Sequence, residues 1–344
     1  MKLIHFADLH IGSKFDRMPE SIKAELLTKL RNAFSKILSY AKENSIDTIL
    51  MSGDIFDRNA VIMSDKKFFY DSMKESPEID FYYIKGNHDS SSKYSESIPN
   101  LHLFSGVQSY LKGEVRIIGY ELSEDNSALY EHSPFSKDRY NVLMLHGDIH
   151  NVRDEDYIDL KRLQGKNVDY FALGHIHKRE DGWLSEARYA YPGCVLGRGF
   201  DETGEKGFLV LDTEDSSISF HALTDVEFER IEVDMKGKNE ASLKSEVSSK
   251  LGDPNGRKIT EIKLTGQADF LPDLEDLGRT FEGRRHYLSF KNASKMALSY
   301  KPSENENSLR SMFINKVLGD PSLDEDTKQK VIEYGLSKLM KEEI

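Results

Sequence analysis

Five short apolar runs in the first half of the chain each end in a cluster of polar residues. The runs cover residues 3–7, 48–52, 81–85, 142–145 and 170–173. Proteins built from α/β sheets place their sites at the carboxyl ends of strands, where loops from neighbouring strands meet. We therefore expect these runs to be strands whose following loops converge on one point.

The clusters that follow these strands are rich in residues that bind metal ions. They are Asp8-Leu9-His10, Gly53-Asp54, Gly86-Asn87-His88-Asp89, His146-Gly147 and Gly174-His175-Ile176-His177. Asp, His and Asn suit Mn, Fe or Zn, and residues two apart on an extended segment face the same way. We predict one dinuclear metal site made by Asp8, His10, Asp54, Asn87, His146, His175 and His177. Two metals ~3.5–4 Å apart clamp a phosphate and acidify a bridging water, so the pattern points to phosphoester hydrolysis.

The spacing between the strands predicts the fold class. A helical pattern over 22–42 places Leu26, Leu30, Phe34, Ile37, Leu38 and Ala41 on one face, and a second helix is expected over 65–74. This β-α-β-α-β order favours parallel pairing with helices over the sheet. After residue 105 strands follow more closely, at 115–119, 188–191, 208–212 and 218–222 as well as in the runs above. We expect an α/β fold of two sheets packed face to face with helices outside, an α-β-β-α sandwich over residues 1–224.

The remainder of the chain has a different pattern. Strands at 228–233, 259–264 and 287–290 and a helix at 240–251 predict a small α/β domain over residues 225–300. Residues 301–344 form a helical tail with apolar faces at Leu309, Met312, Phe313 and Val317 and at Ile332, Leu336, Leu339 and Met340. Those faces either pack on their own domain or form a docking surface for a second copy or a partner.

Composition restricts the classes of function. The net charge of -12 counts against binding nucleic acid through overall charge, but it leaves a local basic face possible. Lys161-Arg162, Arg198 and Arg284-Arg285 are candidates for such a face, although each is expected to be solvated surface. The single cysteine, Cys194, cannot form an internal disulfide and is expected to be a half-buried filler. With no apolar run of roughly 20 residues and no signal-like start, we expect a cytoplasmic protein that does not bind membranes.

Three further features are expected to have no catalytic or binding role. His5 is expected to pack within its strand, and His150 to be a loop residue. Residues 199–206 (GFDETGEK) approximate a phosphate-binding P-loop, but Glu205 stands where the lysine belongs and no strand precedes the segment, so this interpretation is rejected.

The five clusters together resemble a known signature. D-L-H, G-D-I-F-D, G-N-H-D, L-H-G and G-H-I-H resemble, in order, the motifs of the calcineurin-like metallophosphoesterase superfamily and span residues 8 to 177. Residues 6–12 (FADLHIG), 53–58 (GDIFDR), 191–198 (YPGCVLGR) and 205–208 (EKGF) are similar to the SbcD-type nuclease subunit of double-strand-break repair complexes.

The resemblance implies a role for each site residue. One metal would be held by Asp8, His10 and His177, the other by Asn87, His146 and His175, and Asp54 would bridge them. His88 would be the catalytic residue at the scissile phosphate or leaving oxygen, and Asp89 would orient it. Relatives often carry a histidine three residues after the bridging aspartate, where this chain has Asp57, so a role for Asp57 in leaving-group chemistry is doubtful.

The resemblance also implies a function and partners. It implies a DNA nuclease, exonuclease or endonuclease, that uses two Mn²⁺ ions and a metal-activated hydroxide in DNA repair. The domain after residue 225 would help to contact DNA, and the tail would dock on an SbcC-like coiled-coil ATPase; a homodimer is also possible. An enzyme for small phosphodiesters, phosphomonoesters or phosphoproteins is the alternative. A binding scaffold without catalysis is disfavoured, because all seven ligands and His88 are present.

Overall fold

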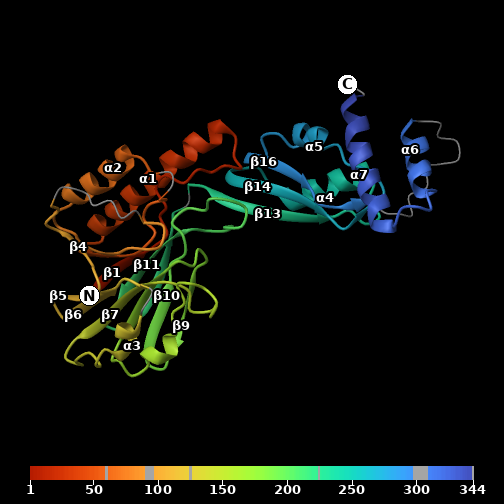
Figure 1. Ribbon diagram of the computed structural model, residues 1–344. Coiled ribbons are helices and arrows are strands. Elements are labelled where there is room, and N and C mark those ends of the chain that lie inside the picture. Colours follow the sequence, from red (N-terminus) through yellow and green to blue (C-terminus); the bar gives the residue numbers. More distant parts are fainter. Residues whose placement is uncertain (59–60, 90–96, 124–125, 224, 297–308, 343–344) are drawn as a thin grey trace. The chain divides into compact units, whose positions relative to one another are not determined.

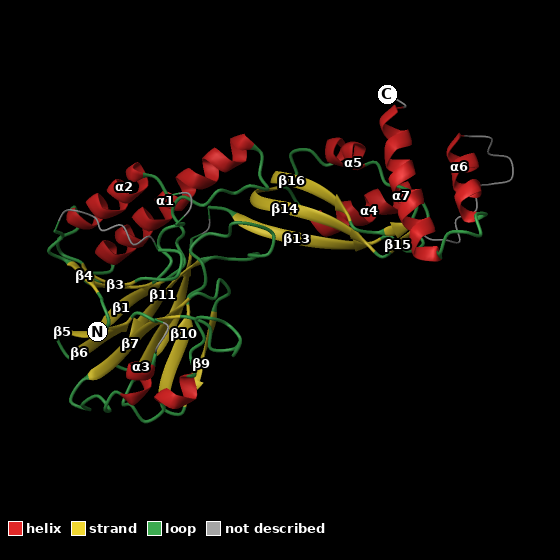
Figure 2. Cartoon of the chain, viewed as in Figure 1, coloured by secondary structure: helices red, strands yellow, loops and turns green. Residues whose placement is uncertain are grey.

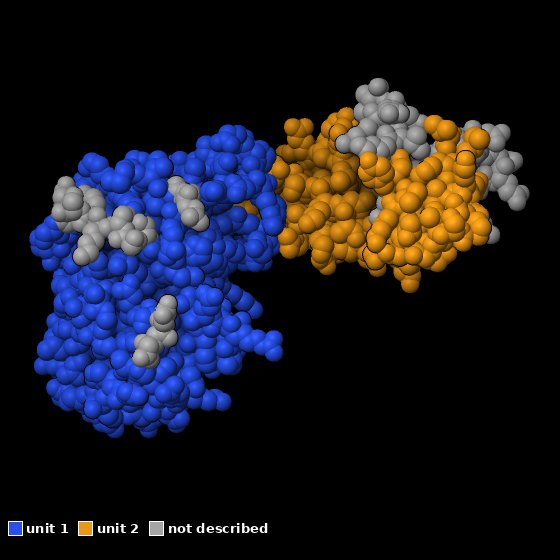
Figure 3. All heavy atoms as spheres, in the orientation of Figure 1, with its two compact units in different colours: residues 1–227 blue, residues 228–344 orange. Residues whose placement is uncertain are grey.

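The structure is a computed structural model that describes residues 1–58, 61–89, 97–123, 126–223, 225–296 and 309–342. The chain divides into two compact units, residues 1–227 and 228–344 (Figure 3). The expected domain 1–224 ends close to this division. The expected border between 300 and 301 falls within 297–308, outside the described residues.

The first unit contains two six-stranded sheets, and the first of them carries three of the five polar clusters. Its strand order is β12-β11-β1-β2-β3-β4. The strands are β1 (Lys2–Phe6), β2 (Thr48–Ser52), β3 (Asp80–Ile84), β4 (Leu101–Leu103), β11 (Gly207–Asp212) and β12 (Ser217–Ala222). Strands β1 to β4 run parallel, whereas β11 is antiparallel to both β1 and β12. The carboxyl ends of β1, β2 and β3 therefore lie at one edge of the sheet.

The second sheet carries the other two clusters and has the order β5-β6-β7-β8-β10-β9. Its strands are β5 (Val107–Lys112), β6 (Val115–Tyr120), β7 (Tyr140–His146), β8 (Tyr170–Gly174), β9 (Glu180–Leu184) and β10 (Ala187–Tyr191). The four central strands β6, β7, β8 and β10 are parallel, and the edge strands β5 and β9 are antiparallel to their neighbours. Both sheets are thus mixed: their central strands are parallel, and antiparallel strands lie toward the edges (Figure 2).

The two sheets pack face to face through one apolar core. Leu3, Leu50 and Tyr82 of the first sheet meet Val142 and Met144 of the second, and all five are at most 2% exposed. This confirms the expected pair of packed sheets. Side chains that alternate along each strand leave a second apolar face on the outside of each sheet, which must also be covered.

The outer faces are covered unequally. Helices α1 (Glu20–Glu43) and α2 (Met63–Lys74) cover the first sheet (Figure 1). Phe34 of α1 contacts both Phe6 of β1 and Phe69 of α2. The six apolar residues predicted for α1 are all buried. Among the described residues, the second sheet is covered by the short α3 (Ser127–Glu131), a 3₁₀ turn at Leu160–Leu163 and loops. The expected fourth layer of helices is therefore thin.

The second unit is built around a three-stranded sheet of order β13-β14-β16. Its elements are β13 (Glu227–Asp234), α4 (Glu240–Leu251), β14 (Asn255–Thr265), β15 (Gln267–Ala268), α5 (Leu274–Thr280), β16 (Arg285–Asn292), β17 (Lys295–Met296), α6 (Leu309–Leu318) and α7 (Glu325–Glu342). Val233, Leu243, Val247 and Ile262 form its core between sheet and helices. The strands and the helix that were predicted here are all present, with β14 longer than expected.

The tail helices pack partly within this unit. Ile314, Val317 and Ile332 are buried together, with Leu271 of the preceding segment against them. Leu309 and Met312, by contrast, are exposed. The side chains of Leu336, Leu339 and Met340, expected on the second face, lie outside the described residues. No helix in the described part of the chain has both the length and the apolar character to cross a bilayer.

Candidate metal centre

The polar clusters meet where the carboxyl edges of the two sheets adjoin. The amide of Asp8 donates to the carbonyl of Gly53 at 3.0 Å, which joins the loops after β1 and β2. Nδ1 of His146, at the end of β7, lies 2.8 Å from the carbonyl oxygen of Ser52, at the end of β2. The second contact links the two sheets, so five loops that are distant in sequence surround one point.

Two groups of ligand atoms form at this point, and Asp8 belongs to both. Asp8, His10 and His177 make the first group, with 3.2 Å between the two Nε2 atoms and 3.7 Å from His177 Nε2 to Asp8 Oδ1. Asp8, Asp54 and His146 make the second, with 3.4 Å between His146 Nε2 and Asp54 Oδ2. Oδ1 of Asn87 lies 3.3 Å from the same His146 nitrogen. Asp54 Oδ2 is also 3.7 Å from His10 Nε2, so its carboxylate lies between the groups.

The backbone at this point is strained. Asp8, His10, Asp54 and His175 have φ values of 52°, 47°, 53° and 99°. Residues other than glycine rarely adopt positive φ values, and each one held there lowers the stability of the fold by about 1–3 kcal/mol. Four such residues in one site show that the backbone which brings these side chains together destabilises the fold.

Two glycines make this close approach possible. A Cβ on Gly53 would strike the His146 ring, and one on Gly86 would strike Asp54. Gly53 also has a φ of 87°, which glycine adopts without strain. A side chain at either glycine would therefore displace a residue of the ligand groups.

The charges of the site fit divalent cations. Asp8 and Asp54 are at most 2% exposed. Burial lowers the pKa of His146, but the hydrogen bond and charge of Asp54 outweigh this and raise it to about 9. Burial would likewise raise the pKa of Asp54, yet His146 and His10 hold it below its usual value. In the protein alone, a proton on His146 thus balances a buried carboxylate, and a metal ion would take over that role.

Hydrogen bonds assign the tautomers of two histidines. Nδ1 of His146 donates to the Ser52 carbonyl. Nδ1 of His177 lies 2.7 Å from Glu202 Oε1, which can only accept, and 2.9 Å from Arg198 Nη2, which itself donates to Glu202 Oε1; the shorter contact is assigned as the hydrogen bond of His177. Each ring therefore points Nε2 at the site, the arrangement typical of metal-bound histidine, and Nε2 of His146 offers its lone pair once its extra proton has left. His10 is fully buried and its Nδ1 has no hydrogen-bond partner. The donor set thus suits two borderline cations, and the identity of the metal is left open.

His175 is placed differently from the other expected ligands. Its ring packs edge-on against His146, with 5.3 Å between centroids, and its Nε2 lies 3.9 Å from Asp154 Oδ2. Its backbone amide lies 3.2 Å from both carboxylate oxygens of Asp8. His175 joins neither close group of ligand atoms among the described residues, so its role as a ligand stays a prediction.

The loop after β3 carries the expected catalytic residues. The amide of His88 donates to Asp54 Oδ1 at 2.8 Å, and its ring lies edge-on to His10, 5.2 Å between centroids. Asp89 is buried, and its two oxygens accept from the amides of Phe56 and Gly86. No hydrogen bond from Asp89 to the His88 ring occurs in the described structure. Asp89 thus fixes the backbone of this loop, and its expected action on the His88 ring stays a prediction.

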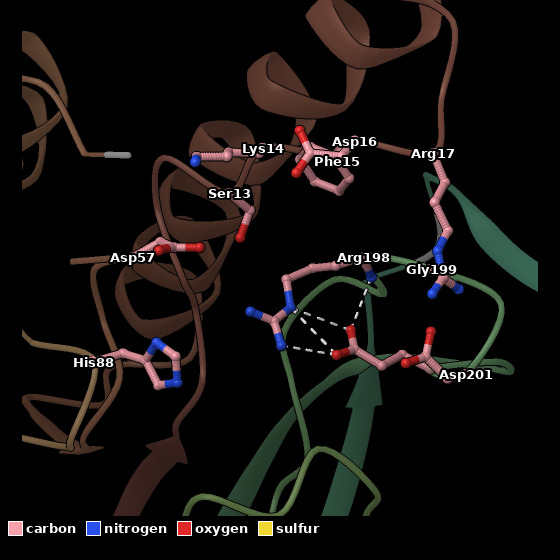
Figure 4. Close-up of a pocket in the computed structure, with 11 residues that line it drawn as sticks. Ser13, Lys14, Phe15, Asp16, Arg17, Asp57, His88, Arg198, Gly199 and Asp201 are labelled. Carbon is pink, nitrogen blue, oxygen red and sulfur yellow. Dashed lines mark hydrogen bonds and ion pairs between the residues drawn. The ribbon is translucent and has the colours of Figure 1, made fainter. Parts of the chain in front are cut away.

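An open cavity of about 450 Å³ adjoins this site (Figure 4). Its lining includes His88 and Asp57, a segment with Ser13, Lys14 and Arg17 after β1, and a loop with Arg198, Asp201 and Glu202. Lys14, Arg17 and Asp201 are exposed. Asp57 lies beside His88 in the wall, and its role in catalysis stays a prediction.

Several residues differ from their sequence interpretation. Arg198 and Arg285, expected as solvated surface, are largely enclosed: Arg198 binds Glu202, and Arg285 donates to Thr260 and to backbone carbonyls. Cys194, expected half-buried, is fully buried. His5 is packed in β1 and His150 lies in a loop, as predicted. The sequence did not predict a role for Glu202, because no local pattern links it to His177, 25 residues away.

Comparison with known proteins agrees with this site. The model of the calcineurin-like phosphoesterase superfamily domain matches residues 1–216. The uncharacterized metallophosphoesterase YhaO of Bacillus subtilis is 30% identical over 269 residues, covering 71% of this chain and 65% of that protein. The DNA double-strand break repair protein Mre11 of Methanocaldococcus jannaschii is 26% identical, covering 72% of this chain and 73% of the relative. Exonuclease subunit 1 of phage T4 is 25% identical, covering 69% and 72%. With its paired Asp and His groups at the edges of two packed sheets, the chain belongs to the calcineurin-like phosphoesterase superfamily.

Proposed function

We propose that this chain is a DNA nuclease that hydrolyses phosphodiester bonds with two divalent cations, Mn²⁺ by preference. One observation carries the proposal: two groups of Asp and His ligand atoms, buried except at His177, share Asp8 and lie next to a cavity lined by His88. Bound cations would supply a water of lowered pKa and positive charge for the developing charge on phosphate.

The residues of this chain have distinct tasks in the proposal. Asp8, His10 and His177 hold one cation, Asn87, His146 and His175 hold the other, and Asp54 lies between them. His88 reaches the cavity from a loop that its own amide fixes to Asp54. We assign to its ring the proton that the leaving ribose oxygen requires, a general-acid role worth about 10²–10⁴-fold in rate.

Support for DNA as substrate comes from the relatives and from the cavity rim. Two of the relatives are named as a DNA double-strand break repair protein and an exonuclease subunit. Lys14 and Arg17 stand on the rim, exposed and without an ion pair in the described structure, where they can meet the phosphates that flank the scissile one. The second unit and the tail are proposed to contact DNA and an SbcC-like ATPase.

One observation favours a smaller substrate. The cavity lining contains four carboxylates, Asp16, Asp57, Asp201 and Glu202, against three basic side chains. Such a lining attracts a polyanion less than a basic groove would. The alternative is therefore a phosphoesterase for small phosphodiesters, phosphomonoesters or phosphoproteins that uses the same metal groups.

The test uses purified protein with Mn²⁺ and end-labelled linear duplex DNA, and compares the wild type with His88→Ala. We expect the wild type to cleave the DNA and the variant to bind Mn²⁺ equally but cleave it at least about 100-fold more slowly. Bis(p-nitrophenyl) phosphate is assayed in parallel. Hydrolysis of this small diester without any cleavage of DNA, alone or with the partner ATPase, would replace the nuclease with the alternative.

A further inference from the structure

A buried carboxylate outside the two ligand groups contacts one of the ligands. We propose that Glu202 is a positioning residue that holds His177 ready to bind a divalent cation, so that one of the two metal sites depends on it. The inference rests on the metal centre of the proposed function, but it does not depend on the substrate. Glu202 lies in the loop between β10 and β11, far in sequence from the motif that contains His177.

The hydrogen bond between these residues fixes the state of the imidazole. Glu202 Oε1 lies 2.7 Å from His177 Nδ1, and Arg198 Nη2 lies 2.9 Å from the same nitrogen. Because this Arg198 nitrogen already donates to Glu202 Oε1 at 2.8 Å, we assign the shorter contact as the hydrogen bond of the imidazole. A carboxylate can only accept, so Nδ1 carries the proton. The lone pair of His177 is then on Nε2, which lies 3.2 Å from His10 Nε2 and 3.7 Å from Asp8 Oδ1. The carboxylate thus selects the tautomer and aims the free nitrogen at the other ligands of the group.

Glu202 is itself held rigidly. The backbone amide of Arg198 donates to Glu202 Oε2 at 2.8 Å, and its Nη2 donates to Oε1 at 2.8 Å. The Sγ of Cys194 lies 3.6 Å from Oε2. The Glu202 side chain is only 11% exposed and is paired with Arg198. Its carboxylate therefore has little freedom to rotate. His177 is 26% exposed and depends on this support, whereas the other members of its group are buried.

The second metal site has no such dependence. Nδ1 of His146 donates to the backbone carbonyl of Ser52, which no side-chain substitution removes. A change at Glu202 should therefore weaken the group of Asp8, His10 and His177 and leave that of Asp54 and His146 intact. A general loss of structure would weaken both groups.

The experiment titrates the purified full chain with Mn²⁺ alone and follows unbound Mn²⁺ by electron paramagnetic resonance. The wild type should bind two ions, and Glu202→Ala should bind one of them roughly 10–100-fold more weakly with the other unchanged. Glu202→Gln should lose less, because its amide oxygen accepts the same hydrogen bond. Adding Glu202→Ala to His177→Ala should weaken binding no further, since both changes act on one ligand.

A matched control is available in the same unit. Glu180 Oε2 lies 3.1 Å from Nε2 of His150, a carboxylate–histidine pair that is more exposed and belongs to neither ligand group. Glu180→Ala should leave both Mn²⁺ affinities unchanged, and thermal unfolding without metal should show that each variant is folded. Equal weakening of both ions, no weakening, or a wild type that binds no Mn²⁺ would each overturn the inference. A wild type that binds two ions but does not cleave DNA would refute only the proposed substrate.

Discussion

Nε2 of His10 and Nε2 of His177 face each other at 3.2 Å, although the residues are 167 positions apart in the chain. His177 carries its proton on Nδ1, so its Nε2 is an acceptor. Burial lowers the pKa of His10 to about 2, so His10 is neutral at physiological pH. The two rings are brought together by strained backbone and share a carboxylate, Asp8. A cation between them explains why the fold holds this arrangement.

Metal binding should release protons. Asp54 raises the pKa of His146 to about 9, against the effect of burial, so His146 is protonated at pH 7.5 in the metal-free protein. A metal ligand must be deprotonated, so Mn²⁺ binding should release about one proton and become tighter as the pH rises toward 9. Calorimetry in buffers of different ionisation enthalpy measures the number released. A binding enthalpy that is independent of the buffer would contradict this view of His146.

Gly86→Ala should abolish tight metal binding. The added methyl group would collide with Asp54 and with His146, and overpacking of this kind costs about 1–3 kcal/mol in stability. Gly278→Ala is the control, because open space surrounds that glycine within helix α5. Mn²⁺ titration and urea unfolding of both variants give the comparison. Wild-type metal affinity in Gly86→Ala would show that the ligands do not need this close packing.

Lys14→Ala and Arg17→Ala should each raise KM for DNA roughly fivefold, corresponding to about 1 kcal/mol. The two side chains stand on the rim of the cavity, outside the ligand groups, so hydrolysis of bis(p-nitrophenyl) phosphate should change little. Lys2→Ala, at the opposite end of β1 from the site, is the control. Equal effects on the DNA and on the small diester would place these residues in catalysis instead.

His5 should make the protein sensitive to acid. It is fully buried between Tyr170 and Ser52, and burial lowers its pKa to about 3. The unfolded chain takes up this proton near pH 6.5, so the stability contribution is complete above that pH and is lost as the pH falls toward 3. Relative to His5→Gln, the wild type in chelator should lose up to about 1.4 kcal/mol of unfolding free energy per pH unit in this window. Parallel pH profiles of the two proteins would exclude this role.

The sequence predicted β1, β2, β3, β7 and β8 because each is an apolar run that ends in a polar cluster. The strands β4, β5 and β9 were missed for a physical reason: they are short or at sheet edges and carry mixed side chains, as in Glu180–Leu184. Edge strands need bury only one side, so no apolar run marks them.

The candidate metal ligands could be predicted from local motifs, whereas the residues that hold these ligands in place could not. The contact of Glu202 with His177 and the enclosure of Arg198 and Arg285 arise only when distant loops meet. The separation of His175 from the close ligand groups likewise depends on loop geometry that spacing does not encode. Backbone bonds from Phe56 and Gly86 to Asp89 could not be foreseen for the same reason.

Diffraction from crystals soaked in Mn²⁺, recorded at an energy where manganese scatters anomalously, tests the dinuclear centre most directly. We expect two anomalous peaks ~3.5–4 Å apart, one bound by Asp8, His10 and His177 and the other by Asn87 and His146, with Asp54 between them. A single peak, no peak, or peaks away from these side chains would contradict the two-metal site.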